Sequence, residues 1–176
     1  MFEELKFVFK VVIDLANDYE SYHDKYGMKS LTVSPSGMHE LKEFKNSSEG
    51  KELEKRENAL YYFLKALDYE VIKAIQVVMY LGRDQDYDKN DTPEKIYSEY
   101  RHYFGSKGWD EKDIIINTVT EKISLGKYLQ DGLGIVGVSG SGARKRGKRF
   151  TIMRKTQTTT NGIEVKHPKL KWNEVP

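Results

Sequence analysis

The sequence predicts a mainly α protein, a small helical bundle, with a β-hairpin appended at the C-terminus. Apolar residues recur at helical spacing through most of the chain from Phe2 to Leu133. Glycine and N-capping residues separate these stretches. After Gly134 the period changes, and two Thr- and β-branched-rich runs flank Asn161-Gly162, a strong hairpin signal. We therefore expect an acidic helical domain over residues 1–138 and a basic hairpin extension over residues 139–176.

Three helices are expected in the first third of the chain. Phe2 to Tyr26 carries an amphipathic stripe, and Gly27 is placed to end that helix. "SLTVSPSG" is typical of a loop, followed by a short helix over 38–44. A break at 46–50 then precedes a helix over about 51–67. Its expected inward residues are Leu53, Leu60, Phe63, Leu64 and Leu67.

The next segment, "YEVIKAIQVVMYLG", has almost no polar side apart from Lys73 and Gln76. This composition predicts the central buried helix of the bundle, because a surface helix would show a polar face. Asp68 is expected to be its N-cap, and Gly82 is expected to end it.

Three further helices are expected before the pattern changes. Asp91 and Glu94 fit a capping box that opens an aromatic-rich helix, which Gly105 would close. Asp110 is expected to cap a helix through 114–119, and the last helix covers 125–133. Nothing before Gly134 has the pattern of a strand.

Two of these helices carry sequences that resemble a known family. "YLGRD" ends the central helix, and "LGKYLQDGL" forms the last one. The chain resembles an uncharacterised bacterial domain of unknown function, in which a buried helix ends in Leu-Gly-Arg-Gly and a later helix has Leu-x-x-Tyr-Leu-x-x-Gly-Leu. Asp84 departs from the last glycine of the first motif. The resemblance covers about residues 2–133, and it implies a small helical domain without an assigned activity. The matching residues are Leu81, Gly82, Arg83, Leu125, Tyr128, Leu129, Gly132 and Leu133.

Charge is divided unequally along the chain. The formal net charge is +2, but ten of the 29 Lys/Arg and only two of the 27 Asp/Glu lie from Ser139 onward. That part carries +8, which leaves −6 for the part from Met1 to Val138. Such an asymmetry is typical of a protein with a charged partner. The absence of cysteine excludes a disulfide framework and favours a reducing cytoplasm. No apolar run approaches the roughly 18 residues of a membrane span, so we expect no membrane partner.

Three stretches have the residue spacing of known motifs, but each lacks a residue or a structural context that the motif requires. "GARKRGKR" has Walker A spacing, but Arg149 replaces the hydroxyl that binds Mg²⁺. "GLGIVG" follows a helix rather than a strand, so a helix end is the better interpretation. "DQDYDKNDTPEK" has Lys89 and Lys95 where a calcium loop needs Gly and Glu. His23, His39, His102 and His167 show no metal-ligand spacing. We expect no catalytic residue, no metal and no cofactor.

The predicted hairpin concentrates positive charge. A two-residue turn at Asn161-Gly162 would place Met153, Leu170 and Trp172 on one face and Arg154 opposite Lys169 on the other. Like charges that face each other are destabilising unless an anion lies over them. Together with the run after Gly142 they form a predicted phosphate-binding cluster, namely Arg144, Lys145, Arg146, Lys148, Arg149, Arg154, Lys155, Lys166, Lys169 and Lys171.

The charge pattern favours a non-enzymatic protein that binds nucleic acid, DNA or RNA, through this basic hairpin. An alternative is a protein-binding adaptor or inhibitor, of bacterial or phage origin, whose acidic body or basic hairpin docks on an acidic or other protein surface. A basic segment that is merely solvated, or that folds back on the acidic body, is also open. An enzyme of unrecognised type is a further alternative. A homo-oligomer is compatible with each of these alternatives.

Overall fold

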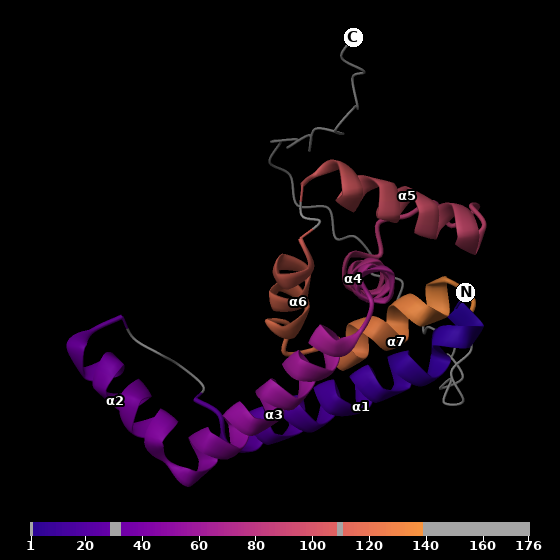
Figure 1. Ribbon diagram of the computed structural model, residues 1–176. Helices are drawn as coiled ribbons and strands as arrows, with labels where there is room; N and C mark the ends of the chain where they lie inside the picture. The colour runs from indigo at the N-terminus through magenta and orange to yellow at the C-terminus, as the bar shows by residue number, and fades with distance from the viewer. Residues whose placement is uncertain (1, 29–32, 109–110, 139–176) are drawn as a thin grey trace, which may run out of the picture. The chain divides into compact units, whose positions relative to one another are not determined.

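The computed structural model describes residues 2–28, 33–108 and 111–138, all within one compact unit, Met1–Ala143. The described residues form seven α-helices and no strand (Figure 1). The prediction of a mainly helical protein is confirmed. The predicted C-terminal β-hairpin lies outside the described residues.

The first and third helices form an antiparallel pair. α1 (Phe2–Tyr26) has the predicted bounds, and α3 (Ser48–Ala66) runs back beside it (Figure 1). An ion pair joins the two helices, with Arg56 Nε 3.0 Å from Asp18 Oδ2. Of the five residues expected to point inward on α3, Leu60 and Leu64 are buried and Leu53 lies outside the core cluster.

α2 (Pro35–Asn46) is longer than predicted because serines cap both of its ends. The Ser34 hydroxyl accepts a hydrogen bond from the backbone N–H of Gly37 at 3.1 Å, and Pro35 fits the first turn. The predicted loop over 30–37 is therefore too long. The predicted break at 46–50 is also wrong, since Ser47 alone separates α2 from α3 and caps the second of them by accepting from the N–H of Gly50 at 3.0 Å.

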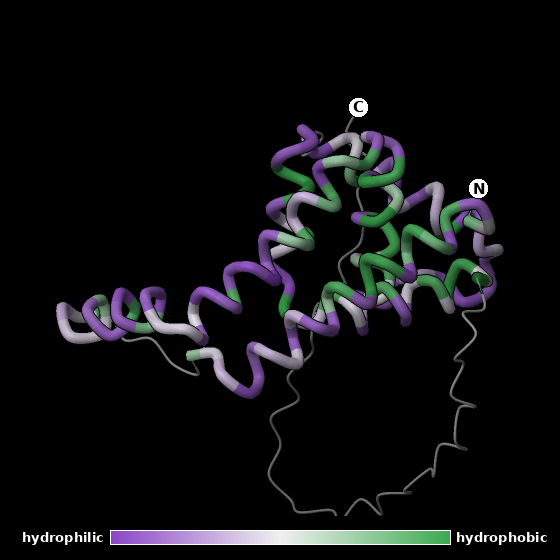
Figure 2. The backbone as a smooth tube through the Cα atoms, turned by 60° about the horizontal axis from the view of Figure 1, so that its bottom comes forward, coloured by the Kyte–Doolittle hydropathy of each residue, from purple (hydrophilic) through white to green (hydrophobic). Residues whose placement is uncertain are grey.

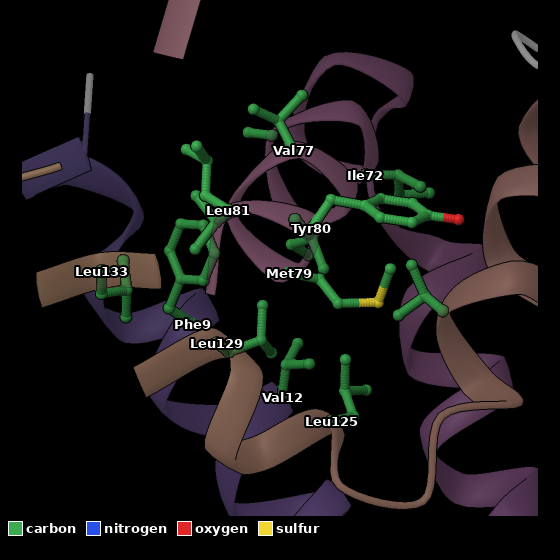
Figure 3. Packing of buried hydrophobic residues seen from close by; sticks show 14 of the residues in the cluster. Phe9, Val12, Ile72, Val77, Met79, Tyr80, Leu81, Leu125, Leu129 and Leu133 are labelled. Carbon is green, nitrogen blue, oxygen red and sulfur yellow. The ribbon is translucent and has the colours of Figure 1, made fainter. Parts of the chain in front are cut away.

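α4 (Tyr69–Asp84) is the central buried helix, as predicted, and every residue from Ile72 to Gly82 is buried. It packs most extensively against α7 (Leu125–Ile135) and also contacts α5 (Pro93–Ser106) and α6 (Lys112–Thr120). α7 in turn lies on α1 (Figure 1). Figure 2 colours the backbone by hydropathy, and hydrophilic residues prevail over α2. The main contributors to the core are shown in Figure 3: Phe9, Val12, Ile72, Met79, Leu81, Leu125, Leu129 and Leu133.

Gly82 does not end α4, and this prediction is wrong. The helix continues to Asp84, and Gln85 takes the left-handed conformation at φ 51° that closes it. Gly82 instead lies where α4 crosses α7. A Cβ atom on Gly82 would fall 1.8 Å from the carbonyl oxygen of Tyr128, and one on Gly132 would fall 2.0 Å from that of Val78. The two backbones therefore touch at this crossing, and only glycine fits on either side.

The N-terminus of α5 also differs from its prediction. The N-cap is Thr92 rather than Asp91, because the Thr92 hydroxyl accepts from the N–H of Lys95 at 3.3 Å. Asp91 forms an ion pair with the Lys95 ammonium at 2.8 Å. Gly105 does not close the helix, which extends to Ser106. Asp110, the predicted cap of α6, lies outside the described residues, and Glu111 holds the N-cap position.

Two glycines of α7 provide a matched test of the close crossing. Gly132→Ala should lower the free energy of unfolding by about 2 kcal/mol or more, because its methyl group meets the fixed backbone of α4. Gly134→Ala meets nothing within 4 Å, so it should be neutral or raise stability by up to about 1 kcal/mol through helix propensity. Chemical denaturation followed by circular dichroism measures both. Equal stabilities of the two variants would contradict the close contact.

Candidate functional site

The residues predicted to bind nucleic acid all lie outside the described part of the chain. This holds for the ten basic residues from Arg144 to Lys171 and for the Asn161-Gly162 turn. Their roles stay predictions. The described helical body contains the family-like motifs, the acidic loop, three histidines and two surface depressions.

The residues of the two family-like motifs mostly hold the helices together. Leu81 is fully buried, as are Leu125 and Leu129. The glycines of the two motifs, Gly82 and Gly132, lie at the same helix crossing. These positions therefore serve packing, which accounts for small and apolar residues there without any chemical role.

Arg83 is the one charged residue of the two motif matches, and it lies at the surface end of α4. Its guanidinium group lies 4.3 Å from the centre of the Tyr80 ring and donates to Asp84, with Nη2 3.0 Å from Oδ2. The hydrogen bond to Asp84 raises the pKa of Arg83. Arg83 is thus engaged by its own helix, as expected for a partly exposed cation over an aromatic ring.

The acidic loop between α4 and α5 is held by local hydrogen bonds. Asp88 Oδ1 accepts from the backbone N–H and the side-chain amide of Asn90, both at 2.9 Å. The Tyr100 hydroxyl donates to the carbonyl of Asp86 at 2.8 Å. Burial, together with the neighbouring Asp84 and Asp86, raises the pKa of that hydroxyl. Among residues 2–28, 33–108 and 111–138, no three His, Cys, Asp or Glu side chains are grouped so that they could hold a metal ion.

The glycine-rich stretch that matches a dinucleotide motif is a helix end, as predicted. α7 continues to Ile135, and Gly137 adopts a left-handed conformation at φ 76°. The N–H of Val138 then donates to the carbonyl of Leu133 at 2.9 Å, which is the closing hydrogen bond of a Schellman-type cap.

Three of the four histidines are described, and they lie on three different helices. His39 on α2 is near Glu43, with 3.6 Å between Nε2 and Oε1, and His102 is exposed on α5. His23 on α1 lies beside Tyr19, with 5.9 Å between the ring centres, and its buried Nδ1 has no hydrogen-bond partner among the described residues. The arrangement offers no pair of histidines for a shared metal or proton, and His167 lies outside the described residues.

A polar depression lies between α3 and α6. It has a volume of about 280 Å³ and is open to solvent, and its lining combines carboxylate, amide and hydroxyl groups from Glu57, Asn58, Tyr61, Asn117, Thr120 and Glu121. The Thr120 hydroxyl donates to the carbonyl of Ile116 at 3.0 Å, so a backbone group already engages it. The two carboxylates suit a cationic or amide group on a partner molecule.

A second depression, of about 220 Å³, lies between α1 and α3. Arg56 forms one wall, and its guanidinium group lies 4.3 Å from the centre of the Tyr22 ring while it pairs with Asp18 and Glu52. The hydrogen bond from Arg56 lowers the pKa of Glu52. Sequence reasoning missed this cluster, because only the Glu52–Arg56 spacing is visible within one helix and the partners on α1 depend on tertiary packing.

Gln76 is an unusual residue in the core. Its side chain is 1% exposed on α4, yet Oε1 has no hydrogen-bond partner in the described part of the chain. Leaving a buried amide oxygen without a donor costs stability. Gln76 and Lys73 are the two buried polar residues of the central helix, and the sequence does not show that the Gln76 oxygen lacks a partner.

The comparisons with known proteins found no match for this chain in a protein-family model, a curated protein or a solved structure. The resemblance to an uncharacterised bacterial family therefore stays a prediction. None of the helices in the described residues combines the length and the apolarity that crossing a bilayer requires.

Replacing Gln76 tests the cost of its buried oxygen. Gln76→Met keeps a similar shape and removes the amide, so we expect the free energy of unfolding to rise by about 1 kcal/mol. Gln76→Ala serves as the control, because it removes the amide but leaves a cavity and should destabilise by about 2 kcal/mol or more. Urea denaturation of the three proteins gives both differences. A loss of stability in Gln76→Met would show that the amide has a favourable role.

Proposed function

We propose that this protein is a non-enzymatic nucleic-acid-binding protein that contacts phosphates through a basic C-terminal β-hairpin. The observation that carries the proposal is the division of charge. The part of the chain from Ser139 onward carries +8, whereas the longer part before it carries −6. A polyanion attracts such a segment through each phosphate that a Lys or Arg neutralises.

The described helices support this assignment by what their own lysines do. Lys10 pairs with Asp14, Lys95 with Glu99 and Lys127 with Asp131, each four residues along the same helix. Acidic neighbours one turn away offset these positive charges. The basic residues after Gly142 have only Glu164 and Glu174 as acidic companions in their part of the sequence. The basic segment is therefore better suited to phosphate binding than the body.

The runner-up proposal is a protein-binding adaptor or inhibitor. The depression between α3 and α6 favours it, because Glu57 and Glu121 present carboxylates on an open surface that a basic side chain of another protein could occupy. In this case the acidic body rather than the basic segment would carry the binding.

A salt-dependent binding assay tests the leading proposal. The full chain should bind labelled duplex DNA, single-stranded DNA or RNA with an affinity that falls steeply between two salt concentrations. Changing Arg144, Lys145, Arg146, Lys148 and Arg149 to alanine should weaken binding about tenfold or more and flatten the salt dependence. Fluorescence anisotropy measures both quantities.

A matched control removes the same number of positive charges from the body. Lys42, Lys45, Lys51, Lys55 and Lys127 are all exposed on the described helices, and their joint change to alanine should leave binding within about twofold of the parent. Absent binding, salt-insensitive binding or an equal loss in the two variants would contradict the leading proposal. Capture of a protein partner that depends on Glu57 and Glu121 would favour the runner-up.

A further inference from the structure

The outer face of the α1–α3 pair, on the side away from the core, exposes apolar side chains. Phe7 on α1 is 74% exposed and Tyr62 on α3 is 64% exposed. Ala59 and Ala66 on α3 are also exposed, and Val11 on α1 is half-buried without belonging to the core cluster. We call this set of five residues the outer patch.

Helix geometry places these residues on one side of the pair. The depression between the helices is lined by Asp18 of α1 and by Lys55 and Ala59 of α3, so these three share the outer side. Phe7 precedes Asp18 by eleven residues, which is about three turns, and Ala66 follows Ala59 by seven, which is about two turns. Phe7 therefore lies in line with Asp18, and Ala66 in line with Ala59.

The register between the helices brings large and small residues together. Asp18 pairs with Arg56 in an antiparallel arrangement, so residues whose numbers add up to about 74 lie side by side. Val11 is then level with Phe63, and Phe7 with the end of α3 next to Ala66. Phe7 projects as a large side chain, whereas the small side chains of Ala59 and Ala66 leave shallow depressions on the surface of α3.

We propose that the outer patch binds a second copy of this chain in a two-fold symmetric dimer. A two-fold interface needs a face that is complementary to itself, because residue i meets residue j and j meets i. A projecting aromatic ring and two small alanine positions on the same face meet that requirement, since Phe7 of each copy can lie over Ala59 or Ala66 of the other. The proposal is independent of nucleic-acid binding.

Charge singles out this face for self-association. The part of the chain from Met1 to Val138 carries −6, so this part of one copy repels the same part of another where acidic surfaces meet. The charged residues along the outer face have both signs, with Lys10, Lys55 and Arg56 against Asp14, Asp18 and Glu52. Charges of both signs beside an apolar area can meet a copy of the same face with less repulsion than a purely acidic surface would cause.

The size of the face sets the expected strength of the dimer. The 19 residues of α3 run beside α1 over about 28 Å, and two adjacent helices are about 20 Å wide. Each copy would then contribute about 600 Å², near the lower limit for a stable specific interface. We therefore expect a reversible dimer at micromolar concentrations rather than an obligate one.

Sedimentation velocity over a range of protein concentrations tests the proposal. The full chain should shift from monomer to dimer, and Phe7→Glu should weaken dimerisation at least about tenfold by replacing the projecting aromatic ring of the patch with a charge. Tyr103→Glu is the matched control, because Tyr103 is a 44% exposed aromatic residue on α5 and its change should leave the dimer intact. Both positions are exposed, so both variants should keep the helical circular dichroism of the parent.

Cross-linking identifies the face directly, because the chain has no cysteine of its own. Phe7→Cys mixed with Ala59→Cys or with Ala66→Cys should give a cross-linked dimer with a short bismaleimide in at least one of the two mixtures. Tyr103→Cys mixed with the same partners should not. A chain that stays monomeric at every protein concentration would overturn the proposal, and the outer patch would then bind a different molecule. A dimer that Phe7→Glu does not weaken, or that no mixture cross-links, would overturn it equally.

Discussion

The contact between Gly82 of α4 and Gly132 of α7 is the constraint on which the rest of the helical body depends. Backbone atoms of the two helices meet there, because neither position has room for a Cβ atom. The close approach lets the apolar side chains of both helices pack against one another, which favours dispersion contacts over the whole crossing. α7 continues this pattern toward α1, where a Cβ on Gly126 would fall 2.0 Å from Asn17 Oδ1. α1 then contacts α3, and α3 contacts α6, which returns to α4, so the helices close a ring that includes the α4–α7 crossing.

This arrangement separates the parts of the chain that build the fold from those that are free to act. The most motif-like residues, the glycines and leucines of α4 and α7, are used in packing. The exposed surface of the described helices is left for binding, and it differs in character from place to place. The polar depression at α3 and α6 suits a cation, and the outer patch suits an apolar surface. The proposed binding of a polyanion rests on the sequence after Gly142.

How much the sequence predicts depends on whether a feature is local. The bounds of α1 follow from its stripe and from Gly27, and the apolar composition of α4 correctly predicts burial. Serine caps shorten the loops around α2 in a way that composition alone does not show. The sequence pattern of a helix-ending glycine is the same as that of a glycine at a helix crossing, so Gly82 is misassigned until α7 is in place. The candidate nucleic-acid site lies outside the described residues and stays a prediction.

Native-state hydrogen exchange tests the central role of the α4–α7 crossing most directly. If the contacts depend on that crossing, the backbone amides from Val77 to Leu81 and from Leu129 to Leu133 should exchange only through global unfolding. They should then share the highest protection in the molecule, above the amides of α2 and α5. Faster exchange in α4 or α7 than in those outer helices would contradict the account, because the crossing would open before the rest of the body.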